Sequence, residues 1–99
     1  MKSQYKRRVV DAVDEVIGDI VNDIINKYYS NYVETDYDYE KILYYIAWAI
    51  KHEVFGGKAS LNDVVDYLAK LKSKKSLARI VLSYLIARSL EESPTPPAR

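Results

Sequence analysis

The 99-residue chain contains no cysteine, a single histidine, three glycines and three prolines. Without cysteine there can be no disulfide, no thiolate nucleophile and no cysteine-ligated metal ion. Because His52 is the only histidine, metal sites that need two histidines are excluded, and we expect His52 to be an ordinary side chain near a helix end. These absences remove most catalytic chemistry, so we predict no enzymatic activity, no cofactor, no metal ion and no small-molecule substrate.

The sequence also lacks a long hydrophobic run and a strong net charge. No segment approaches the roughly 20 apolar residues that a membrane-spanning helix needs. Basic residues near the start resemble the beginning of a signal peptide, but Asp11, Asp14 and Glu15 interrupt the apolar stretch that would follow. The formal net charge of +1 excludes the basic composition of a general nucleic-acid coat protein. We therefore expect a cytoplasmic protein with no membrane contact.

Apolar residues recur every three or four positions, which predicts an all-α domain resembling a four-helix bundle over residues 1–92. The predicted helices span about 3–29, 37–54, 61–72 and 77–92. Gly56 and Gly57 are expected to end the second helix, Ser60 and Asp63 to form a capping box for the third, and Ser76 to cap the fourth. Residues 93–99 contain three prolines and no large apolar residue, which predicts a disordered tail. Ten tyrosines and the absence of cysteine are compatible with a thermophilic source.

The fourth predicted helix is apolar around nearly its whole circumference. Such a helix is either central in the domain or covered on one side by a second molecule. If Leu77, Ile80, Val81 and Tyr84 face the core, then Leu82, Ile86 and Leu90 lie on the opposite side. A contiguous apolar row of this kind is more typical of a protein interface than of a free surface. We therefore predict that Leu82, Ile86 and Leu90 contact a partner.

Two aromatic residues of the second predicted helix are further interface candidates. Its predicted core face is Ile42, Ile46, Ala49 and Ile50, which leaves Tyr44 and Trp48 on the far side beside several basic residues. Three interpretations remain open for this pair: burial within the fold, a protein-partner surface, or a platform on which unpaired bases stack.

A cluster of basic residues surrounds the turn between the third and fourth predicted helices: Lys70, Lys72, Lys74, Lys75 and Arg79. The cluster is either a solvated turn whose cations suit the end of a helix or a set of contacts to nucleic-acid phosphates. Base reading by the fourth helix is disfavoured, because most of its side chains are apolar.

The combination of spare apolar surface and missing catalytic groups predicts a non-enzymatic protein–protein interaction module. It would act as a homo-oligomer or as a small accessory subunit of a larger assembly. The alternative is a nucleic-acid-binding protein that contacts phosphates through the basic cluster.

Overall fold

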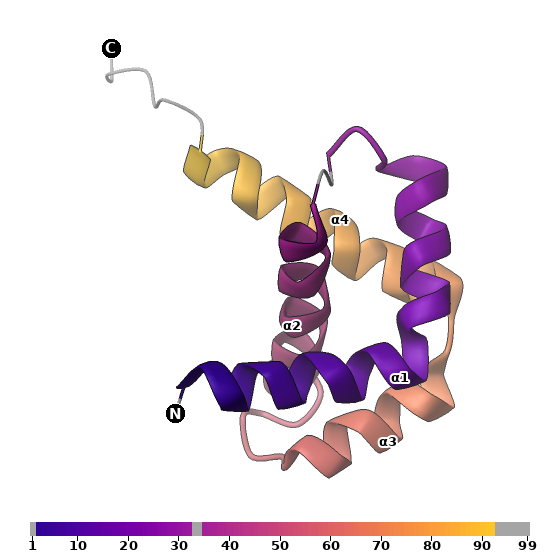
Figure 1. Ribbon diagram of the computed structural model, residues 1–99. Coiled ribbons are helices and arrows are strands. Elements are labelled where there is room, and N and C mark those ends of the chain that lie inside the picture. Colours follow the sequence, from indigo (N-terminus) through magenta and orange to yellow (C-terminus); the bar gives the residue numbers. More distant parts are fainter. Residues whose placement is uncertain (1, 33–34, 93–99) are drawn as a thin grey trace.

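The computed structural model describes residues 2–32 and 35–92 of the chain. These residues form four α-helices and no strand, which confirms the predicted all-α fold (Figure 1). The helices are α1 (Lys2–Tyr28), α2 (Asp36–Glu53), α3 (Leu61–Leu71) and α4 (Lys74–Glu92). Helix α1 contacts the other three helices, and α2 also contacts α3 and α4. The tail predicted at 93–99 lies outside the described residues.

Both ends of helix α2 carry the groups that helix termini require. The side-chain oxygen of Thr35 accepts a hydrogen bond from the backbone N–H of Asp38 at 3.2 Å. The helix ends at Glu53, and the following Gly56 and Gly57 have φ of +65° and +85°, which residues with a Cβ rarely adopt. The predicted stop before this glycine pair is therefore confirmed.

Serine side chains determine where α3 and α4 begin. The Ser60 hydroxyl accepts a hydrogen bond from the N–H of Asp63, whose carboxylate accepts one from the N–H of Ser60, which confirms the predicted capping box. The predicted start of the fourth helix at 77, with Ser76 as its cap, is wrong. Helix α4 begins at Lys74, because the Ser73 side chain accepts a hydrogen bond from the N–H of Ser76 and so starts the helix earlier.

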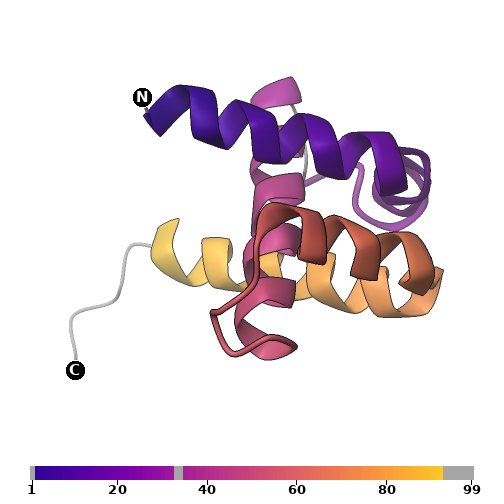
Figure 2. The ribbon, with the colours of Figure 1, turned by 90° about the horizontal axis from the view of Figure 1, so that it is seen from below.

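Helix α1 bends sharply about halfway along its length, so that its two halves run in different directions (Figures 1 and 2). Gly18 lies near this midpoint, and the Tyr39 hydroxyl of α2 lies 3.1 Å from its carbonyl oxygen and 2.8 Å from Asp14 Oδ1. A Cβ at position 18 would overlap the Asp14 carboxylate. Glycines and side chains that contact the helix backbone are recognised causes of helix bending. The bend allows one helix to cover two sides of the core.

The core consists of aliphatic side chains from all four helices. The largest fully buried side chains are Val13, Ile17, Val21, Ile24, Ile42, Leu43, Ile46, Leu68, Leu77 and Val81. The four predicted core positions of α2, Ile42, Ile46, Ala49 and Ile50, are all buried. Leu43 and Ala47 are buried as well, although the predicted core face of this helix omits them. The reason is that α2 packs against three neighbouring helices, which cover a wider arc than one partner would.

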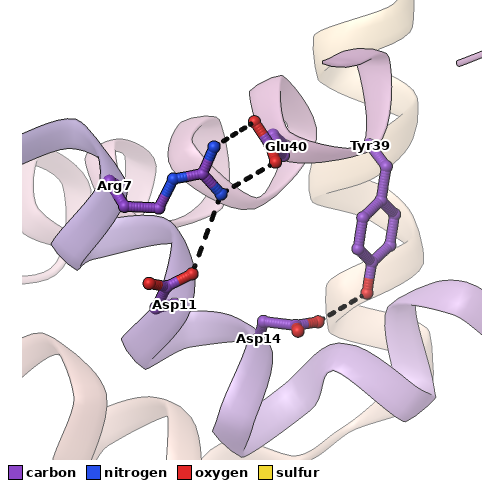
Figure 3. Close-up of polar contacts among 5 residues, drawn as sticks. All are labelled: Arg7, Asp11, Asp14, Tyr39 and Glu40. Carbon is purple, nitrogen blue, oxygen red and sulfur yellow. Dashed lines mark hydrogen bonds and ion pairs between the residues drawn. The ribbon is translucent and has the colours of Figure 1, made fainter. Parts of the chain in front are cut away.

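Two ion pairs connect the first turns of α2 to other helices. Arg7 of α1 donates to both carboxylate oxygens of Glu40, at 2.9 and 3.5 Å, and also lies near Asp11 (Figure 3). Arg88 of α4 places its Nη1 3.2 Å from Oδ1 of Asp38, whose side chain is largely buried. The second pair holds the C-terminal half of α4 against α2.

Candidate functional site

Helix α4 has a buried side and an exposed apolar side. Leu77 and Val81 are fully buried, whereas Leu82, Ile86 and Leu90 are 42%, 52% and 73% exposed. We call these three residues the outer row. The first half of the prediction for this helix, that one side faces the core and the other does not, therefore agrees with the structure. Contact of the outer row with a partner remains a prediction.

The packing of α4 on α2 explains why the outer row points away from the core. Tyr84 lies between the buried and exposed sides, and its ring contacts that of Tyr45 at 5.3 Å between centroids. Together with the Asp38–Arg88 ion pair, this contact fixes the rotation of α4 about its axis. Beyond this ion pair, the C-terminal end of α4 extends past α2 (Figure 1).

A groove adjoins the outer row where the end of α1 meets the start of α4. Its volume is about 520 Å³. It is lined by Tyr28, Tyr29, Lys74, Lys75, Ala78, Arg79 and Leu82. We call it the α1–α4 groove. Tyr28 is 61% exposed, although its spacing from the buried Ile17 and Ile24 places it on the same side of α1. Sequence reasoning therefore missed this surface residue.

The aromatic pair predicted on α2 is divided between surface and core. Trp48 is 48% exposed, and its ring lies 5.8 Å from that of Tyr45 and 4.6 Å from that of His52 between centroids. Tyr44 is half-buried against the core, with Lys6 Nζ 5.2 Å from its ring centroid. Both line a hollow of about 180 Å³ between α1, α2 and α3, separate from the α1–α4 groove. Of these two residues, Trp48 is therefore the one with a broadly exposed ring.

The basic cluster is exposed, as both of its interpretations require. Lys70, Lys72, Lys74, Lys75 and Arg79 are all exposed residues at the end of α3 and the first turns of α4. Lys74 pairs with Asp23 of α1, and this contact raises the pKa of Lys74 and lowers the pKa of Asp23. Lys72 ends α3 with φ of +34°. One member of the cluster thus has a structural role in joining α4 to α1.

Within residues 2–32 and 35–92, no group of three or more His, Cys, Asp or Glu side chains is placed to hold a metal ion. Partial burial and the hydrogen bond to Asp14 raise the pKa of the Tyr39 hydroxyl, so it stays protonated at neutral pH. None of the helices in the described part of the chain is long and apolar enough to cross a membrane.

A comparison with protein-family models, curated proteins and solved structures finds no match to this chain.

Proposed function

We propose that this protein is a non-enzymatic binding module that recognises another protein through the outer row of α4. The observation that carries the proposal is the row itself: three large aliphatic side chains, four residues apart on one helix, all exposed. Single exposed leucines are ordinary, but a contiguous row beside a groove is typical of interaction surfaces.

The free energy available from covering the row is large enough to drive association. Complete burial of one such side chain contributes about 1.5–3 kcal/mol, so the exposed fractions leave about 2.5–5 kcal/mol for the three residues together. The groove walls, Tyr28 and Tyr29, add aromatic area of the kind that dominates interface energetics. Ordering of the partner and loss of its rotational freedom oppose this gain, so contacts beyond the row are also needed. The partner is a second copy of the chain or a subunit of a larger intracellular assembly.

The test is the molecular mass in solution, measured across a range of protein concentrations for the wild type and for Leu82→Glu/Ile86→Glu. Val54→Glu is the matched control, because Val54 is also an exposed aliphatic residue but lies at the end of α2. We expect an associating wild type and control, and a folded double variant that is monomeric.

A monomeric wild type combined with an unfolded double variant would contradict the proposal, because the row would then belong to the core. A monomeric wild type with a folded double variant would leave a different protein as the partner. Binding of a mixed-sequence oligonucleotide that weakens steeply with salt would instead favour the alternative function at the basic cluster.

A further inference from the structure

The α1–α4 groove and the outer row form one apolar strip along α4. Ala78 and Leu82 line the groove, and Ile86 and Leu90 continue the same spacing of four residues. The thirteen residues from 78 to 90 span about 18 Å of helix. Residues four apart form one ridge on a helix surface, and such ridges pack into the grooves of a second helix at a crossing angle of about −50°. The strip therefore has the length and spacing of a helix-docking surface about three turns long.

The charge along the strip has one sign. Every charged side chain that lines the groove is basic: Lys74, Lys75 and Arg79. From Lys74 to Leu90 the sequence contains no Asp or Glu. Lys74 is paired with Asp23. Within the part of the chain that the structure describes, Lys75 and Arg79 make no ion pair, so their charges are available to a partner.

We propose that the partner presents an acidic amphipathic helix. Its apolar residues, spaced three or four apart, would cover the outer row and fill the groove between Tyr28 and Leu82. Asp or Glu residues on one edge of that helix would lie next to Lys75 and Arg79. This inference rests on the proposed function and adds the chemistry of the partner to it. Helix-in-groove recognition uses this combination of apolar anchors and flanking charges.

The same geometry argues against a nucleic acid as the occupant. Phosphates would satisfy Lys75 and Arg79 but would leave the aliphatic row in water. Bases bind by stacking on flat aromatic rings. Tyr28 and Tyr29 offer such rings at the groove end of the strip, whereas Leu82, Ile86 and Leu90 offer none and would stay uncovered. A peptide helix covers both the charges and the apolar strip.

The experiment uses a displayed library of helical peptides that share a fixed apolar stripe. The solvent-flanking positions of each peptide are randomised among Glu, Gln and Lys. The library is selected against the full-length wild type and three full-length variants: Lys75→Glu/Arg79→Glu, Leu82→Ser/Ile86→Ser, and the control Arg8→Glu/Lys58→Glu. The control changes the net charge by the same amount at two exposed residues outside the strip.

We expect the wild type and the control to enrich Glu-containing peptides and to bind them about tenfold more tightly than their Lys counterparts. The Lys75→Glu/Arg79→Glu variant should reverse this preference, and its retained binding of Lys peptides would show that it is folded. The Leu82→Ser/Ile86→Ser variant should enrich no peptide while keeping the circular dichroism of the wild type.

Three results would overturn the inference, and they differ in what they say about the proposed function. If wild-type selection depends on Leu82 and Ile86 but shows no preference for Glu, the binding surface stands and the acidic partner is wrong. If the wild type enriches no peptide, or the same peptides as Leu82→Ser/Ile86→Ser, both proposals fail. An oligonucleotide that binds the wild type and loses affinity in Lys75→Glu/Arg79→Glu, with peptide binding unchanged, would assign the basic residues to phosphates and also overturn the inference.

Discussion

Replacing Arg88 with methionine should reduce the free energy of unfolding by about 2–3 kcal/mol, because it leaves the buried Asp38 carboxylate without its ion-pair partner 3.2 Å away. Removing one partner of a fully buried pair costs about 3–5 kcal/mol. Two effects reduce that value here. Asp38 lies in the first turn of α2, where the helix dipole stabilises a negative charge by about 0.3–1 kcal/mol. Methionine also keeps much of the packing of the arginine stem.

Urea and thermal unfolding measure this effect directly. For a domain of this size, 2–3 kcal/mol corresponds to a decrease in Tm of roughly 10–20 °C. The double variant Asp38→Asn/Arg88→Met should recover at least half of the loss, since both charges of the ion pair are then removed. A decrease below about 0.5 kcal/mol for Arg88→Met, or a double variant whose loss equals the sum of the two single losses, would refute the role given to this ion pair.

Three further outcomes follow from the described contacts. Because the pKa of Tyr39 is raised in the folded chain, the unfolded chain loses this proton at a lower pH than the folded chain does. The free energy of unfolding should therefore fall as the pH rises above about 10. Tyr39→Phe should make that fall less steep, as measured by urea unfolding at a series of pH values. Ser60→Ala should lower the free energy of unfolding by about 1 kcal/mol, and Ser60→Gly by only a few tenths. Gly18→Ala should lower the free energy of unfolding by about 1 kcal/mol despite alanine's better helix propensity, because the new Cβ displaces Asp14 from Tyr39. In an Asp14→Ala/Tyr39→Phe background, Gly18→Ala should not destabilise the chain.

Features that depend on neighbouring residues could be predicted from the sequence. The Ser60–Asp63 capping box and the stop before Gly56 use contacts within four residues, so they are readable from spacing alone. The outer row could be predicted for a similar reason. Helical periodicity places Leu82 and Ile86 opposite Leu77 and Val81 whatever the rest of the fold looks like.

Features that depend on contacts far apart in the chain could not be predicted. At the bend of α1, the Tyr39 hydroxyl donates a hydrogen bond to the carbonyl of Gly18, 21 residues away in the sequence. An acidic residue such as Asp38 is typical of the first turn of a helix. Its burial and its ion pair with Arg88 depend on the packing of α4 against α2. The α1–α4 groove also needs the bent helix to bring Tyr28 next to α4. A helical wheel contains no information on such pairings.

The availability of the outer row is the central claim, and cysteine alkylation tests it most directly because the natural chain has no cysteine. The measurement is the rate of maleimide labelling of Ile86→Cys, with exposed Val54→Cys and buried Leu77→Cys as references. At low protein concentration, Ile86→Cys should react as fast as Val54→Cys and far faster than Leu77→Cys. Adding a selected acidic helical peptide should slow Ile86→Cys alone. Labelling as slow as that of Leu77→Cys in the dilute chain, or full reactivity beneath a bound peptide, would contradict the account.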